Sequence, residues 1–321
     1  MIKKIIKVTL ITCVSILGLF IVSLFFGARY PMDKSAEEIE AKYLEDSSSF
    51  INIDGVNIHY TDEGTGPAIL LLHANYANLI DWKPWVETLS PNYRIIRMDI
   101  PGHGLTEADP LNDYSMPRSV FLIETLISSL GIKQLSVVGA SLGGTIGIHF
   151  TRNNPEIVDH LILVSPGALN PRVRGSNEPA KLPKAFNLMT QITPRLLVKG
   201  LLTGGFGDPS NISEELITRW HDLLLREGQR DAQMARMRQY VSGDIDQVIK
   251  QVKAPVLIMW GKKNKVVPVE LAYEMKNLLV NSHSIEIIIY ESGGHQLVQE
   301  LGQETAVDAL EYLVQSNQEA M

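Results

Sequence analysis

The chain has 321 residues, 45% of them hydrophobic and 20% charged, and a formal net charge of -7. This length can bury the core of one large α/β domain, while an acidic balance with mixed signs along the chain argues against a nucleic-acid partner. The one cysteine, Cys13, cannot form a disulfide within the chain, and no spacing of Cys and His suggests a zinc site.

The N-terminus predicts a membrane anchor over 1–30. Lys3, Lys4 and Lys7 precede an uncharged run at 8–28, which as a helix would measure about 31 Å, close to the hydrocarbon thickness of a bilayer. A cleaved signal peptide has a shorter apolar stretch, so we expect an uncleaved transmembrane helix. The lysines favour a cytoplasmic N-terminus, which would make this a single-pass membrane protein with its catalytic domain outside the cytoplasm.

The stretch 31–49 is acidic and ends in serines, and we interpret it as a linker. The folded domain is expected to cover 50–317. Apolar residues alternate with polar ones on both sides of Asp54-Gly55, which predicts a hairpin of two antiparallel strands. The continuous apolar run 68–72 predicts a strand inside a sheet that helices cover on both faces.

Strands and helices then alternate along the chain. Ile95 and Ile96 belong to a second buried strand, and Ser115 can cap a helix that stops at Gly131. The apolar run 135–139 predicts the next strand, and a helix follows it directly. This alternation predicts a mostly parallel sheet with helices on both faces.

The turn after that strand carries the strongest chemical signal. Gly139-x-Ser141-x-Gly143 is the nucleophile elbow pattern, in which a serine sits in a strained turn and only very small neighbours fit around its backbone. The serine hydroxyl then projects clear of the sheet. We therefore predict Ser141 as a nucleophile.

The regular alternation stops between 165 and 242. This stretch holds six prolines, a glycine-rich segment at 203–207 and a predicted helix from Ser213 to about Tyr240. We interpret 165–242 as an insertion. Strands at 256–260 and 285–290, each followed by a helix, restore the pattern.

Several motifs together resemble the α/β-hydrolase family over 50–317, and they occur in the family's order. They are Leu70-Leu71-Leu72-His73, Asp99-Ile100-Pro101-Gly102-His103-Gly104, the elbow, Trp260-Gly261 with Val267-Pro268, and Gly293-Gly294-His295. The resemblance implies an eight-stranded sheet, with the insertion between strands six and seven forming a helical cap. With its anchor, the chain looks similar to membrane-bound monoacylglycerol-lipase-like members.

The resemblance also implies roles for individual residues. A serine hydroxyl needs a neighbouring base, and His295, just past the last strand, stands where the family places it. The family's oxyanion donors correspond to the backbone N–H groups of Leu142 and Asn75. Ala74 replaces a glycine that is usual in this loop, and alanine does not readily adopt a positive φ. No metal or organic cofactor is implied.

The third triad position departs from the family. Relatives usually carry an aspartate after the Trp-Gly pair, whereas this chain has Asn264. The amide could accept the histidine N–H but could not stabilise an imidazolium, and such a replacement in a serine triad lowers turnover by about 10⁴-fold. Glu291, Glu270 and Asp99 are alternative acids.

The sequence therefore predicts a membrane-anchored serine hydrolase that cleaves carboxylic esters, with monoacylglycerol-like lipids among its candidate substrates. A C–C bond hydrolase or a cofactor-free haloperoxidase would use the same serine. Asn264 and Ala74 favour a rival of another class, a non-catalytic or weakly active α/β-hydrolase-like protein that binds a ligand.

Overall fold

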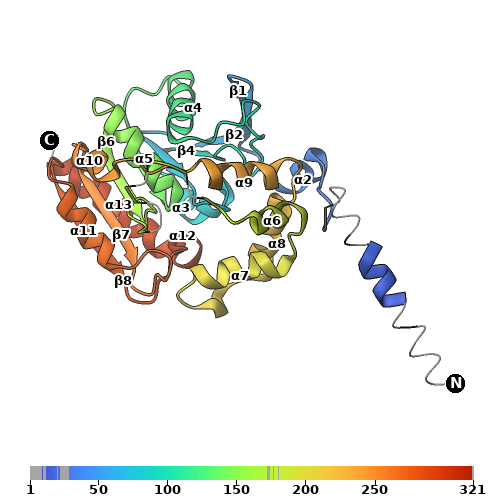
Figure 1. Ribbon diagram of the computed structural model, residues 1–321. Helices are drawn as coiled ribbons and strands as arrows, with labels where there is room; N and C mark the ends of the chain where they lie inside the picture. The colour runs from blue at the N-terminus through green and yellow to red at the C-terminus, as the bar shows by residue number, and fades with distance from the viewer. Residues whose placement is uncertain are drawn as a thin grey trace.

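A computed structural model describes residues 9, 12–19, 21, 29–171, 174–175, 177–179 and 181–319 (Figure 1). Within this part of the chain, no helix combines the length and the apolar character needed to cross a membrane. This finding overturns the predicted transmembrane helix and the single-pass membrane location that depended on it. Most of the predicted anchor, including 1–8 and 22–28, lies outside the described residues.

An eight-stranded sheet forms the centre of the protein, in the order β1-β2-β4-β3-β5-β6-β7-β8. Strand β2 runs antiparallel to β1 and β4, and all other neighbours are parallel. The mostly parallel sheet and its opening hairpin are therefore confirmed. The strands are β1 Ser48–Ile53, β2 Val56–Glu63, β3 Ala68–Leu72, β4 Arg94–Met98, β5 Leu135–Ala140, β6 Val158–Val164, β7 Val256–Gly261 and β8 Ile285–Tyr290.

Two apolar cores lie against the two faces of this sheet, because successive strand residues point to opposite sides. Strands β3, β5 and β7 are buried at every position, as expected for strands covered on both faces. One core includes residues of α4 Met116–Ser129, α5 Leu142–Asn153, α10 Ile245–Lys250 and α11 Glu270–Leu278. The other includes residues of α3 Lys83–Leu89, α12 Leu297–Glu300 and α13 Gly302–Glu319.

The insertion between β6 and β7 forms a group of helices beside the sheet, coloured yellow to orange in Figure 1. The predicted single helix from Ser213 to Tyr240 is wrong, since it is two helices. The chain turns at Gly228, which has a φ of 84° that few other residues could adopt. The helices are α6 Leu188–Gln191, α7 Arg195–Gly205, α8 Glu214–Leu224 and α9 Gln229–Gln239, with 3-10 turns at Lys184–Asn187 and Pro209–Asn211.

The expected linker is largely ordered and packs on these cap helices. Residues Ala36–Tyr43 form α2, whose Ile39 is buried beside Leu105 and Leu223. Two isolated bridges pair Tyr30 with Ile192 and Lys34 with Arg226. The folded unit therefore includes residues from 29 onwards, and β1 begins at Ser48.

Candidate active site

Ser141 lies in a strained turn between β5 and α5. Its φ of 47° and ψ of -108° are unusual for a non-glycine residue. The flanking glycines are required, because a Cβ on Gly139 would lie 2.4 Å from the carbonyl oxygen of Gly143, and a Cβ on Gly143 would lie 2.1 Å from that of Leu72. The predicted elbow geometry is present, and it presents the hydroxyl at the start of α5.

The imidazole of His295 meets that hydroxyl. Its Nε2 lies 2.9 Å from Ser141 Oγ, which is hydrogen-bond distance. The two residues are brought together from β5 and from the loop after β8. Removal of the imidazole from water lowers the pKa of His295 to about 4, so the ring is neutral at physiological pH.

Asn264 faces this histidine with its amide nitrogen. The amide Oδ1 accepts hydrogen bonds from the backbone N–H groups of Val266 at 3.0 Å and Val267 at 2.9 Å. Its Nδ2 then lies 3.1 Å from His295 Nδ1. An amide nitrogen only donates, so His295 Nδ1 must accept and the ring proton must sit on Nε2. That tautomer points a proton at Ser141 and opposes proton transfer from it.

Two of the three alternative acids have other partners. Glu291 is exposed and pairs with Lys262 at 2.7 Å. Asp99 accepts from the ring of His59 at 2.7 Å and from two backbone N–H groups. Glu270 begins α11. Within the described chain, none of these carboxylates has a hydrogen bond to His295.

The predicted oxyanion donors flank the elbow. The Leu142 N–H is the first of α5, where the helix dipole favours negative charge. Asn75 lies in the loop after β3, and this loop is fixed on α5 because the Gly143 N–H donates to the His73 carbonyl at 3.1 Å. Among the described residues, neither Leu142 N–H nor Asn75 N–H donates to a protein acceptor. Both are available to a ligand.

In the loop after β3, the residue with a positive φ is Tyr76, and Ala74 keeps an ordinary backbone conformation. Among the described non-glycine residues with positive φ, the loop contributes Tyr76, at 63°, and not Ala74. His103 Nε2 donates to the Asn75 side-chain oxygen at 3.0 Å, and His73 Nδ1 donates to the Ala74 carbonyl at 2.7 Å. These two histidines therefore brace the loop.

A second chain of Ser, His and Asp lies at the opposite end of the sheet order. His59 connects Ser48 Oγ, at 2.8 Å, with Asp99 Oδ2. Here, however, Ser48 Oγ also accepts the Glu45 N–H at 3.0 Å, and Asp99 accepts the N–H groups of Leu79 and Leu105. We interpret this arrangement as a brace for the N-terminal strands.

A carboxylate that was not predicted from the sequence holds the His295 loop. Glu300 accepts from the backbone N–H groups of Gly294 at 2.8 Å, Gly207 at 3.0 Å and Asp208 at 2.8 Å. The carbonyl of Gly205 accepts from the His295 N–H at 2.6 Å. The glycine-rich segment 203–207 is thus joined to the histidine loop, and only its position five residues after His295 could have drawn attention to Glu300.

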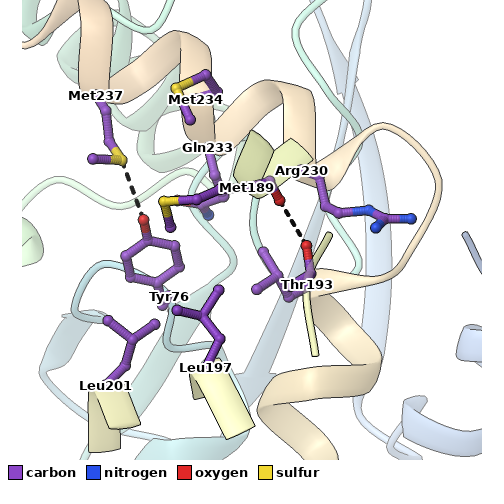
Figure 2. Close-up of a pocket in the computed structure, with 10 residues that line it drawn as sticks. Tyr76, Met189, Thr193, Leu197, Leu201, Arg230, Gln233, Met234 and Met237 are labelled. Atoms are coloured by element: carbon purple, nitrogen blue, oxygen red, sulfur yellow. Dashed lines mark hydrogen bonds between the residues drawn. The ribbon is translucent and has the colours of Figure 1, made fainter. Parts of the chain in front are cut away.

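A mostly apolar pocket lies between Tyr76 and the cap helices (Figure 2). Its lining is dominated by methionine and leucine side chains, which can move apart around an apolar chain. In this structure the pocket has room for about one water molecule, and neither Ser141 nor His295 lines it. Among the described residues, no group of three or more His, Cys, Asp or Glu side chains is placed to hold a metal ion. The pocket residues are Tyr76, Met189, Thr193, Leu197, Leu201, Leu224, Arg230, Gln233, Met234 and Met237.

Several named hydrolases are similar to this chain in sequence or in fold. The chain is 29% identical over 259 residues to the 2-hydroxy-6-oxo-6-(2'-aminophenyl)hexa-2,4-dienoic acid hydrolase of Metapseudomonas resinovorans, covering 78% of this chain and 85% of that protein. It is 26% identical over 231 residues to a 2-hydroxy-6-oxo-6-phenylhexa-2,4-dienoate hydrolase of Comamonas testosteroni, covering 66% and 77%. A meta-cleavage product hydrolase from Pseudomonas fluorescens IP01 has the same fold, with a TM-score of 0.69 at 22% identity over 85% of this chain and 98% of that one.

The three similar proteins are named as hydrolases, which agrees with the prediction. None of them supports the expected likeness to membrane-bound monoacylglycerol-lipase-like members, so that part of the expectation is corrected. The family model described as "alpha/beta hydrolase fold" matches residues 67–300. Because that span includes every element that positions Ser141 and His295, the chain belongs to the α/β hydrolase family and is an enzyme of that family.

Proposed function

We propose that this enzyme cleaves carboxylic esters through an acyl-enzyme formed on Ser141. The observation that supports the proposal most is the 2.9 Å contact between Ser141 Oγ and His295 Nε2 within the elbow turn. A serine held in this way beside an imidazole is the arrangement that acyl transfer requires.

The proposed reaction has two halves. The His295 ring proton, which the Asn264 amide holds on Nε2, first moves to Nδ1 as that amide turns its oxygen towards the ring. Ser141 Oγ then bonds to the ester carbonyl carbon while its proton passes to His295 Nε2, and the N–H groups of Leu142 and Asn75 stabilise the oxyanion. The bond to the alcohol then breaks, and His295 returns the proton to the leaving oxygen. Water repeats the sequence on the acyl-enzyme and releases the acid.

The pocket supports an apolar acyl chain as the substrate's main feature. Six of the ten lining residues are leucine or methionine. The guanidinium of Arg230 points away from the other lining side chains and is bound by Asp33 (Figure 2). Medium-chain esters, including monoacylglycerols, fit such a lining better than anionic substrates do.

A second candidate is hydrolysis of a C–C bond beside a ketone, which the names of the relatives favour. It begins with the same attack of Ser141 on a carbonyl carbon. It differs in the leaving group, which is a carbanion equivalent that must be protonated in place of an alkoxide.

Labelling with a fluorophosphonate probe tests the reactive serine. Wild type and the control Ser48→Ala are expected to be labelled, and Ser141→Ala is not. Ser48 is the matched control because its hydroxyl also contacts a histidine, at 2.8 Å. Absence of labelling in the wild type, or equal labelling in Ser141→Ala, would contradict the proposal.

Turnover then separates the two candidates. p-Nitrophenyl esters of increasing chain length are compared with a 2-hydroxy-6-oxo-dienoate under single-turnover conditions. Ester hydrolysis that increases with chain length supports the proposal, whereas cleavage of the dienoate alone favours the C–C bond reaction.

A further inference from the structure

Tyr76 occupies a backbone conformation that tyrosine rarely adopts. Its φ of 63° lies in the left-handed region, which glycine enters freely and bulky residues avoid. It directly follows Asn75 in the loop that faces the elbow. Strained residues of this kind persist only where their surroundings hold them, and they gather at ligand-binding sites.

The hydroxyl of this tyrosine has a weak partner. It donates to the Sδ atom of Met237 at 3.2 Å, and a thioether is a poor acceptor. Tyr76 is partly buried, and tyrosine hydroxyls removed from water usually bond to an oxygen or nitrogen atom. Burial raises the pKa of Tyr76, so the hydroxyl keeps its proton and remains a donor at physiological pH. A ligand oxygen would be a better acceptor than the sulfur.

The hydroxyl is directed into the pocket. Figure 2 shows the Tyr76 ring pointing towards Met237, with Leu197, Leu201 and Met189 nearby. Methionine side chains are unbranched and change rotamer easily, so Met237 can move aside when a ligand enters. The hydroxyl is therefore a polar group within an otherwise apolar lining.

Ser141 and His295 do not line this pocket, but two of its walls are connected to the elbow turn. The Gly143 N–H donates to the His73 carbonyl, so the loop that carries Tyr76 rests on the first turn after Ser141. On the cap side, Tyr240 is hydrogen-bonded to Thr145, whose Oγ1 lies 3.4 Å from the Ser141 carbonyl oxygen. Tyr240 follows the pocket residue Met237 by three positions, so the cap wall of the pocket is connected to the first turn of α5, as the Tyr76 loop is.

We infer that Tyr76 is a specificity-determining residue whose hydroxyl donates a hydrogen bond to a neutral oxygen, a ketone or an ether, carried on the apolar chain of the substrate. This role rests on the proposed function, because its effect on kcat/KM can be measured only if the enzyme cleaves esters. The preferred substrates are esters whose acyl chain bears such an oxygen, and plain fatty acyl esters are the poorer class.

The test compares p-nitrophenyl octanoate with its keto-octanoate isomers, in which the ketone is moved along the chain. In Tyr76→Phe, which removes only the hydroxyl, kcat/KM for the favoured keto ester is expected to fall about tenfold, mainly through KM. The value for octanoate should change by less than about twofold. Met237→Leu removes the competing sulfur and should keep or increase the preference for the keto ester.

Tyr273→Phe is the matched control, because that tyrosine is 53% exposed and lies outside the pocket. It should alter neither ester. Equal loss of both esters in Tyr76→Phe, or a wild type that prefers no keto isomer, would overturn the inference.

Binding to Ser141→Ala separates this inference from the proposed function. If calorimetry shows tighter binding of a keto ester than of octanoate, and adding Tyr76→Phe removes the difference, Tyr76 has the inferred role even where the wild type cleaves neither ester. If both esters are cleaved and Tyr76→Phe changes no preference in turnover or in binding, the ester hydrolase proposal stands and the inference is refuted.

Discussion

The orientation of the Asn264 amide determines which ring nitrogen of His295 carries the proton. The residue type at 264 is visible in the sequence, but the orientation of its side chain is not. That orientation follows from the N–H groups of Val266 and Val267, which both point at the amide oxygen. An aspartate in the same place would give one oxygen to these N–H groups and offer the other to His295 Nδ1–H.

Asn264→Asp is therefore expected to raise turnover by about 10²- to 10⁴-fold. The carboxylate would select the tautomer with the proton on Nδ1, leave Nε2 free to accept the Ser141 proton, and stabilise the imidazolium that forms. Steady-state kinetics with a p-nitrophenyl ester measures the gain. Asn281→Asp, at an exposed asparagine, is the control for added charge. An unchanged rate in Asn264→Asp would show that another group orients His295.

The depressed pKa of His295, about 4, predicts the pH dependence. Only the neutral ring accepts a proton, so wild-type kcat/KM should fall with acid near pH 4, whereas a free histidine titrates near about 6.5. The unfolded chain binds this proton already below about pH 6.5, so the contribution of His295 to stability is full above that pH and is lost as the pH falls towards 4.

The acid limb of the Asn264→Asp variant should lie at a higher pH than that of the wild type. A neighbouring carboxylate raises a histidine pKa by about 1–3 units, so Asn264→Asp should move the acid limb upwards by that amount. Profiles of kcat/KM between about pH 3 and 9 measure the acid limb of the wild type, near pH 4, and that of the variant at higher pH. A wild-type limb near pH 6.5, or no movement in the variant, would contradict the assignment of His295 as the base.

At the scale of elements, the histidine loop and the end of cap helix α7 form one interlocked unit. A Cβ on Gly207 would lie 2.2 Å from the Ser292 carbonyl oxygen, and a Cβ on Gly294 would lie 2.3 Å from the Gly207 nitrogen. The glycines at 207 and 294 therefore mark a close approach of two backbones. In the sequence they indicate only a flexible segment, because their partners lie almost ninety residues away.

Local signals explain which elements could be predicted. The buried strands and helices α4 and α5 follow from apolar runs and from caps such as Ser115, whose Oγ accepts the Arg118 N–H at 3.3 Å. Helix α3 was missed and the cap helices were joined incorrectly, since their ends depend on packing against distant residues. Ser141, His295 and their meeting could be predicted because both lie at strand ends of one sheet.

Glu300→Gln tests the joint between cap and histidine loop. The carboxylate accepts three backbone N–H groups, and an amide would turn a donor towards at least one of them, which disrupts charge-assisted bonds that contribute about 1.5–3 kcal/mol each. We expect faster amide hydrogen exchange in 205–208 and 292–296, together with about tenfold slower fluorophosphonate labelling. Glu304→Gln, at an exposed glutamate on α13, should change neither. Unchanged exchange in Glu300→Gln would refute this role.

At the scale of the whole molecule, the segment 29–47 holds the cap helices. Arg230, whose side chain is 1% exposed, is bound by Asp33 and by the Pro31 carbonyl. Asp222 on α8 accepts from Tyr43 at 2.8 Å and lies 3.2 Å from Lys34 Nζ. Composition marks this stretch as a polar linker because it is acidic and poor in apolar residues. The segment 29–47 pairs with charged side chains buried in the cap, and the sequence does not show that these charges lie next to it.

A chain shortened to begin at residue 29 is therefore expected to keep the stability of this unit, and one shortened to begin at residue 47 is not. The shorter chain would remove the ion-pair partners of Arg230 and Asp222, open both groups to water, and expose the apolar site of Ile39. Loss of the buried Ile39 contact costs about 2 kcal/mol, and loss of these partly exposed ion pairs adds about 1 kcal/mol each. Urea unfolding and limited proteolysis within 184–239 measure the effect. Glu38→Gln in the longer chain is the control, because its pair with Lys34 is largely exposed and contributes about 0.5 kcal/mol. Equal stability of the two shortened chains would mean that the folded domain begins near residue 50, as composition alone predicts.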